Sequence, residues 1–236
     1  GVSQDAGTLL FVYRDCLFTV ADSVQPPKAG SLVFCRHLTF RPGEWVCEIG
    51  AGVGLAAVLA ARAGCQVIAT DLVPEAVACV KANAVLNGVA DRLDARLGDC
   101  YDPVRRLEFD LICSSPPQMP TPPERERDDP MAAADNGGLD GWMVLDRVIE
   151  GALAHLAPGG RLVFTLFDFL GRERAFAKLR AAGLEPSVLG KDAQPFPRLG
   201  YERLEHIRTH DVERTVPAEG WPATVERYVI QGGRTP

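Results

Sequence analysis

Three acidic residues stand where apolar stretches of the sequence end, and glycines follow the first of them. Glu48 lies near the end of the stretch 45–49 and precedes the alternating glycines of 50–54, while Asp71 and Asp99 follow the next two apolar stretches. Alternating glycines at a strand-to-helix turn let the backbone approach a small cofactor closely. Carboxylates at neighbouring strand ends can accept hydrogen bonds from an amine, from both hydroxyls of a ribose and from the exocyclic amine of an adenine.

The glycine spacing distinguishes between the cofactors that such a turn could hold. A nicotinamide dinucleotide site requires G-x-G-x-x-G or A, but Leu55 occupies the third position and Gly54 comes one place early. A phosphate-binding P-loop requires a lysine after its glycines, and none follows here. A ligand with an amino acid, a ribose and an adenine but no phosphate fits the three acids. The residues therefore predict S-adenosylmethionine as the cofactor.

The elements that would position these residues alternate between strands and helices from residue 44 onward. This alternation is typical of a parallel sheet covered by helices on both faces. The predicted strands are 45–49, 66–70, 93–97, 109–114, 161–167, 184–189 and 224–230, and the predicted helices are 52–63, 74–86, 142–156 and 172–182. The segment 190–223 is compatible with two or three further elements.

The first 43 residues have a different pattern. Alternating apolar residues in 8–13 and 17–20 predict a β-hairpin, and Ser31 is predicted to cap a helix over 32–38. We expect residues 1–43 to form a cover over the cofactor pocket and residues 44–236 to form the cofactor-binding domain.

Five motifs together resemble the Rossmann-like class I methyltransferases over about residues 44–170. They are the run 48–54, Asp71, Gly98-Asp99, the run 110–117 and the run 156–160. The resemblance implies an α/β three-layer sandwich with a seven-stranded, mostly parallel sheet whose last strand is antiparallel. The cofactor contacts are expected from Glu48, Gly50, Ala51, Gly52, Gly54, Asp71, Leu72, Asp99, Cys100 and Ser114.

The run 114–118, Ser-Ser-Pro-Pro-Gln, resembles the N-P-P-Y or D-P-P-Y acceptor motif of methyltransferases that act on planar nitrogen, among them the release factor glutamine methyltransferases. The run 137–141 is similar to the same branch. A side-chain oxygen and the carbonyl beside the first proline can hold both N–H groups of an amide, so that the nitrogen lone pair faces the methyl group. Ser115, Pro116 and Gln118 are the predicted catalytic residues.

Two positions depart from that motif. Ser115 replaces Asn or Asp with a rotatable hydroxyl, and Gln118 replaces the aromatic residue that would stack on a planar acceptor. We therefore expect a small polar metabolite as the methyl acceptor, with nitrogen slightly favoured over oxygen. A protein glutamine or RNA-base methyltransferase is the first alternative. A module that binds S-adenosylmethionine without catalysis is the second.

Composition limits the partners and the location. A net charge of −6 argues against a nucleic-acid partner, which would require clustered Lys and Arg. Seven scattered cysteines without a C-x-x-C pair, no leader and no long apolar run predict a cytoplasmic protein that does not enter a membrane. A homodimer remains open.

Two further features of the sequence bear on the site. His206 and His210 are four residues apart, but no third ligand is evident, so no metal is expected. The loop 118–136 follows the acceptor motif and is expected to act as a lid or to be a solvated insertion.

Overall fold

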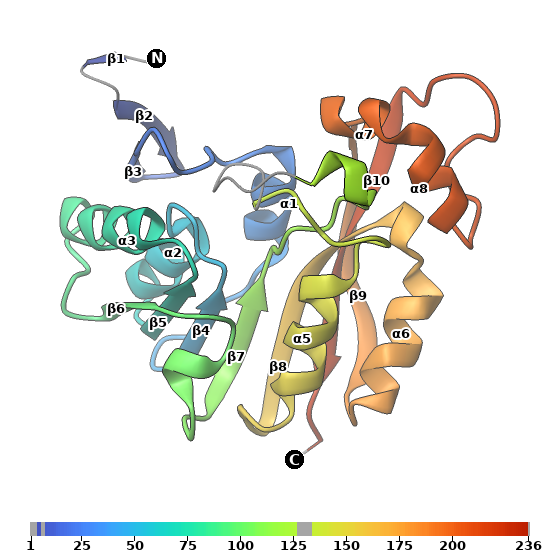
Figure 1. Ribbon diagram of the computed structural model, residues 1–236. Helices are drawn as coiled ribbons and strands as arrows, with labels where there is room; N and C mark the ends of the chain where they lie inside the picture. Colours follow the sequence, from blue (N-terminus) through green and yellow to red (C-terminus); the bar gives the residue numbers. More distant parts are fainter. Residues whose placement is uncertain (1–3, 6–7, 127–133, 236) are drawn as a thin grey trace.

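A seven-stranded sheet forms the centre of the molecule (Figure 1). The computed structural model describes residues 4–5, 8–126 and 134–235. The strand order is β6-β5-β4-β7-β8-β10-β9, and β10 runs antiparallel to both of its neighbours. The strands are β4 (Trp45–Ile49), β5 (Gln66–Asp71), β6 (Leu93–Leu97), β7 (Phe109–Ser114), β8 (Leu156–Phe167), β9 (Glu185–Pro195) and β10 (Thr224–Gly233).

Helices cover both faces of this sheet, each over its own hydrophobic core. On one face lie α1 (Ala29–His37), α2 (Leu55–Arg62) and α3 (Pro74–Leu86), and on the other lie α5 (Met143–Ala152) and α6 (Arg172–Ala181). The predicted three-layer sandwich, with a mostly parallel sheet and an antiparallel last strand, is confirmed. In such a sheet the carboxyl ends of the parallel strands meet at one edge, which is where ligands bind.

The N-terminal segment forms a small sheet and a helix that pack on the same layer as α2 and α3. Strands β1 (Gln4–Asp5), β2 (Thr8–Tyr13) and β3 (Cys16–Val20) pair in order, and Phe18 and Phe34 are buried in the core that α2 also lines. Helix α1 crosses β8, β9 and β10. It starts at Ala29, with Lys28 at the cap position, so the expected Ser31 cap is wrong.

The glycine turn delays the start of α2. The sequence predicts a helix from residue 52, but Gly52 and Gly54 have φ angles of +56° and +77° and the helix begins at Leu55. Positive φ angles are incompatible with a right-handed helix. The predicted helix therefore starts too early, because it includes residues of the glycine turn.

Strand β8 begins five residues before its predicted start. The run Pro158-Gly159-Gly160 is a bulge inside the strand, because Phe109 pairs with Leu156 whereas Leu111 pairs with Arg161. A Cβ on Gly160 would lie 2.9 Å from the Phe109 carbonyl oxygen, so glycine permits this close approach. The preceding helix α5 consequently ends at Ala152.

The C-terminal third forms a long antiparallel ribbon with two short helices between its strands. Strands β9 and β10 both extend past their predicted ends, and α7 (Arg198–Glu202) and α8 (Leu204–His210) fill the segment that the sequence left open. The 3-10 helices are η1 (Asp102–Val104), η2 (Pro123–Arg125) and η3 (Asp168–Leu170). Among the described residues, no helix has both the length and the apolar character needed to cross a membrane.

Candidate active site

The glycine turn lies at the carboxyl ends of β4 and β5, with backbone groups fixed on its sheet side. The Gly50 N–H donates to the Thr70 carbonyl over 2.8 Å, and the Gly52 N–H donates to Asp71 Oδ2 over 2.8 Å. A Cβ placed on Gly50 or Gly52 would have no atom of the described chain within 4 Å. The outer face of the turn is therefore open, and any side chain there would fill the space.

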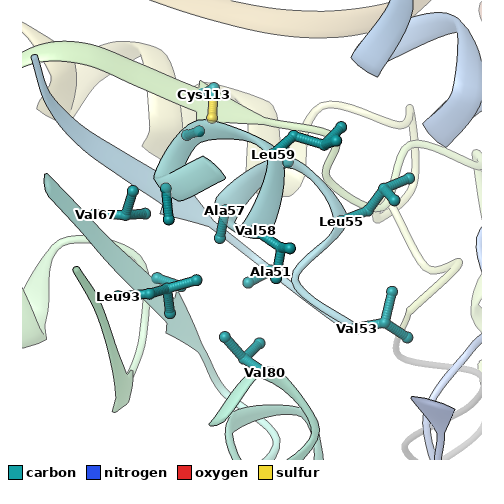
Figure 2. Packing of buried hydrophobic residues seen from close by; sticks show 14 of the residues in the cluster. Ala51, Val53, Leu55, Ala57, Val58, Leu59, Val67, Val80, Leu93 and Cys113 are labelled. Atoms are coloured by element: carbon teal, nitrogen blue, oxygen red, sulfur yellow. The ribbon is translucent and has the colours of Figure 1, made fainter. Parts of the chain in front are cut away.

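The third glycine of the turn serves packing instead. A Cβ on Gly54 would lie 3.1 Å from both γ carbons of Val80 on α3. Figure 2 shows Val80 of α3 below the turn, which carries Ala51 and Val53. The turn is thus open to a ligand on one side and held by the core on the other.

Two carboxylates accept hydrogen bonds from the turn and from α2. Glu48 is 6% exposed, and its Oε2 accepts the Ala57 N–H of α2 over 2.8 Å. Burial raises the pKa of Glu48 to about 8. Asp71 accepts the Gly52 N–H with one oxygen and the Val73 N–H with the other over 2.9 Å, and burial raises its pKa as well.

The remaining predicted cofactor residues lie just after β5 and β6. Leu72 is 65% exposed beside Asp71, so its apolar side chain faces solvent at this edge. Asp99 forms an ion pair with Arg147 of α5, at 2.8 Å, and its side chain stays partly exposed. Cys100 has a φ of +45°, and its carbonyl accepts the Thr70 hydroxyl over 3.1 Å.

The acceptor motif follows β7 at the same edge of the sheet. Ser114 is fully buried, and its hydroxyl donates to the Ile49 carbonyl over 2.8 Å, which ties β7 to β4. Ser115 is partly exposed, and its Oγ lies 3.0 Å from Thr165 Oγ1 on β8. Pro116 is buried directly after it.

Gln118 is held by β8 through all of its polar atoms. Its Nε2 donates to the carbonyl and to the hydroxyl of Thr165, over 2.7 and 2.9 Å, and its Oε1 accepts the Phe167 N–H over 3.1 Å. Thr165 is fully buried, so its own hydroxyl hydrogen requires an acceptor. Thr165 accepts from Gln118, and in its contact with Ser115 either hydroxyl can be the donor.

The loop after the motif is packed where the structure describes it. The Met119 carbonyl accepts the Gly137 N–H over 3.0 Å, and Thr121 donates its N–H to Gly138 over 2.8 Å. A Cβ on Gly137 would lie 2.8 Å from the Gln118 Cα, so a glycine is needed there. The expected lid over 118–136 includes residues 127–133, which lie outside the described residues.

The histidine pair considered as metal ligands makes backbone contacts. His206 Nε2 lies 2.7 Å from the Leu139 carbonyl, and His210 Nδ1 lies 3.0 Å from the His206 carbonyl. No group of three potential metal ligands occurs among the residues that the structure describes.

Sequence reasoning missed two polar residues at this edge, Thr165 and Arg227. Each is a polar residue inside a predicted strand that is otherwise mostly apolar, and this exception in the pattern could have marked it as a candidate site residue. Their partners lie on other strands, so their positions beside Ser115 and Phe167 could not be derived from local pattern.

Comparisons with known proteins place this geometry among methyltransferases. Residues 23–123 match the family model described as the methyltransferase small domain. The chain is 35% identical to the release factor glutamine methyltransferase of Cereibacter sphaeroides, a match covering 84% of this chain and 74% of that protein. It is 31% identical to the release factor glutamine methyltransferase of Gloeobacter violaceus, over 75% and 70% of the two chains.

The tRNA m1G37 methyltransferase of M. jannaschii is a structural neighbour. Its TM-score is 0.65 at 13% identity, with 99% of this chain and 59% of that chain covered. At this level of identity, the likeness bears on the fold alone.

These relatives correct one expectation from the sequence. The proteins from Cereibacter sphaeroides and Gloeobacter violaceus are named for the methylation of glutamine in a release factor, which is a protein. The expectation that the acceptor and partner is a small polar metabolite is therefore wrong. That expectation gave too much weight to the two departures at Ser115 and Gln118, whereas 84% of the chain matches the relative from Cereibacter sphaeroides.

Proposed function

The chain belongs to the family of S-adenosylmethionine-dependent methyltransferases that includes the release factor glutamine methyltransferases, and on this premise we propose that it methylates a glutamine side-chain amide in a protein. The observation that carries the proposal is the 35% identity over 74% of the relative from Cereibacter sphaeroides. The net charge of −6 supports a protein rather than a nucleic acid as the acceptor.

The residues at the glycine turn fit S-adenosylmethionine. The open space beside Gly50 and Gly52 supports close passage of the cofactor over the backbone. We propose that Glu48 holds the amine of the methionine part and that Asp71 holds the ribose hydroxyls, with Leu72 against the adenine. The cofactor roles of Ala51, Gly54, Asp99, Cys100 and Ser114 are part of the same proposal.

When bound, S-adenosylmethionine supplies an electrophilic methyl group on a positively charged sulfur. The protein then has to hold the amide nitrogen in line with that methyl group and with its lone pair available. We propose that Ser115 Oγ and the carbonyl beside Pro116 accept the two N–H groups of the glutamine amide. The proline ring limits the motion of that carbonyl.

Within this proposal Gln118 positions Ser115 through Thr165 and does not touch the acceptor. All three polar contacts of its amide are made to β8. The hydroxyl of Ser115 would rotate freely on its own, and its hydrogen bond with Thr165 restricts it. The rotatable serine thereby gains part of the fixed orientation that a planar Asn or Asp has.

Two broader inferences complete the proposal. We propose that α1 and the segment before it cover the acceptor side of the site, which the packing of α1 on β8 and β10 supports. We also propose a cytoplasmic location, which the free thiols of all seven cysteines support.

Methyl transfer to a translation release factor tests the proposed function. The purified chain, S-adenosylmethionine labelled in its methyl group and a release factor should give label in the protein fraction, and mass spectrometry should locate it on a glutamine side chain. A release factor with that glutamine replaced serves as the substrate control. Ser187→Ala, at an exposed serine on β9, serves as the control for Ser115→Ala. An unlabelled release factor, despite calorimetric binding of S-adenosylhomocysteine, would refute the proposal.

A further inference from the structure

Arg227 on β10 is a buried cation whose guanidinium forms no ion pair or hydrogen bond within the described chain. The residue is 8% exposed, and its Nε is buried without a hydrogen-bond partner. No ion pair or hydrogen bond joins its guanidinium to any residue in the described part of the chain. Buried arginines are normally paired, so the missing partner requires an explanation.

Both faces of the guanidinium are covered. Its Cζ lies 3.3 Å from the ring centroid of Phe167, which is a stacked cation–π contact. On Gly30 in the first turn of α1, a Cβ would lie 3.0 Å from Arg227 Nη2 and 3.2 Å from Cζ. The planar group is therefore held between an aromatic ring and a glycine, and its buried Nε–H lacks a hydrogen-bond partner in the described chain.

The nearby acid does not supply that partner. Asp168 follows Phe167, and its Oδ2 accepts the Glu226 N–H over 3.1 Å. Its Oδ1 is buried without a hydrogen-bond partner, but no ion pair joins it to Arg227. Burial lowers the pKa of Arg227 to about 9, an effect that the charge of Asp168 opposes. At neutral pH the guanidinium remains a cation whose hydrogen-bonding edge has no protein acceptor.

The sheet places Arg227 on the acceptor side of the active site. Arg227 pairs with Phe167 on β8, and the Phe167 N–H donates to Gln118. Thr165, which contacts Ser115, precedes Phe167 by two residues and so lies on the same face of β8. Arg227 and Ser115 therefore share one face and one edge of the sheet.

From this arrangement we propose that Arg227 binds a carboxylate of the acceptor polypeptide, next to the glutamine held at Ser115. A guanidinium edge matches a planar carboxylate with two parallel hydrogen bonds. The carboxylate of the methyl donor is the other possible source of this group. Strand β10 is three places from β4 in the sheet order, or roughly 14 Å, which favours the acceptor. The inference rests on the proposed function for the identity of the acceptor.

The first experiment tests carboxylate binding without methyl transfer. In the complete chain saturated with S-adenosylhomocysteine, the NMR signal of the Arg227 Nε–Hε group is followed during titration with acetate. We expect a saturable shift that chloride at equal ionic strength does not reproduce. A signal that responds equally to both anions would overturn the carboxylate site.

The second experiment tests the source of the carboxylate by kinetics with a release factor. Arg227→Met keeps an apolar contact on Phe167 and should raise the KM for the release factor about 10- to 100-fold, the loss expected for a charged hydrogen-bonded contact. The kcat and the affinity for S-adenosylmethionine should change little, and Arg227→Lys should retain part of the binding. Lower affinity for S-adenosylmethionine with an unchanged KM for the release factor would assign the carboxylate to the donor and overturn the proposal.

Two further variants separate binding from folding. Gly30→Ala leaves Arg227 in the chain and favours the helix, but its methyl group would displace the guanidinium, so the KM should rise here too. Arg62→Met removes an exposed arginine in the last turn of α2 that is paired with Asp15, and it should leave the KM at the wild-type value. An unchanged KM in both Arg227→Met and Gly30→Ala would refute the inference.

The outcomes distinguish this inference from the proposed function. No methylation of the release factor together with an acetate-specific shift would refute the proposed function and support the carboxylate site. Methylation together with no acetate shift would support the proposed function and refute the site.

Discussion

At the scale of single residues, the acceptor site depends on one chain of hydrogen bonds. Gln118 donates to Thr165, and Thr165 contacts Ser115, so the two positions that depart from the family motif belong to one network. A change at Ser115 from a planar amide to a hydroxyl requires something to orient the hydroxyl. The network suggests that Gln118 compensates for Ser115, and this link can be tested.

We expect Ser115→Ala to lower kcat for methyl transfer roughly 10- to 100-fold and Thr165→Val to lower it about tenfold, with little change in cofactor affinity. Valine has nearly the shape of threonine without its hydroxyl, so it removes the bond to Ser115 while it preserves the packing. If Thr165 acts through Ser115, the double variant should be no slower than Ser115→Ala alone. Losses that multiply in the double variant would contradict the link.

The residue scale is also where sequence reasoning was least complete. Glu48 and Asp71 could be proposed because each ends a strand and strand ends meet at one edge. The role of Gln118 could not be derived, because it depends on contacts to Thr165 and Phe167, which lie about 50 residues later in the chain. The same holds for Arg227, whose aromatic neighbour is on another strand.

At the scale of elements, an asparagine of α3 and the asparagine that follows this helix complete the hydrogen bonding of the edge strand β3. Asn83 accepts the Thr19 N–H over 2.8 Å and donates to the Thr19 carbonyl over 3.0 Å, and Asn87 makes the equivalent pair with Leu17. Asn83 also donates to the Val53 carbonyl in the glycine turn over 2.9 Å. A helix thus supplies to β3 the partners that a further strand would supply.

Asn83→Ala should lower the free energy of unfolding by about 3 kcal/mol, because it leaves several buried backbone groups without partners. Asn87→Ala is the matched control, since Asn87 is only half-buried, and should cost under about 1 kcal/mol. Urea denaturation measures both values. Hydrogen exchange should show faster exchange of the Thr19 amide in Asn83→Ala. Equal losses of stability in the two variants would be evidence against the larger role of Asn83 in holding β3 and the glycine turn.

Element boundaries show what local pattern can and cannot provide. Strands β4, β6 and β7 and helix α3 have the predicted bounds, because apolar runs or helical periodicity end there at turn residues. The start of β8 was missed because Pro158-Gly159-Gly160 is a common turn sequence. In this protein the pairing of Phe109 with Leu156 continues the sheet through it as a bulge.

At the scale of the whole molecule, the sheet separates two cores and carries a titratable group between them. Glu48 is on β4, near the middle of the sheet, and its pKa is raised to about 8 by burial. Such burial costs stability unless a cation is present. In the proposed function that cation is the amine of the cofactor. The loss of stability caused by burying Glu48 would then be the consequence of keeping a carboxylate that binds the cofactor.

The raised pKa of Glu48 predicts how global stability depends on pH. Between its usual pKa of 4.5 and about 8, the folded state holds the proton that the unfolded state releases. The contribution of Glu48 is therefore full below pH 4.5 and is lost as the pH rises to about 8, by up to about 1.4 kcal/mol per pH unit. Glu48→Gln lacks this contribution, so its stability relative to wild type should increase with pH across that range and then level off.

Denaturant unfolding at several pH values measures this difference, with Asp94→Asn on β6 as the control because Asp94 is exposed and paired with Arg96. The free energy of unfolding of Asp94→Asn should depend on pH as that of the wild type does. If the free energy of unfolding of Glu48→Gln also changed with pH in parallel with the wild type, the raised pKa of Glu48 would be contradicted. Saturating S-adenosylhomocysteine carries the same amine as the cofactor. If that amine pairs with Glu48, it stabilises only the carboxylate form of this residue. The ligand should therefore weaken the pH dependence of the free energy of unfolding in the wild type and leave that of Glu48→Gln unchanged.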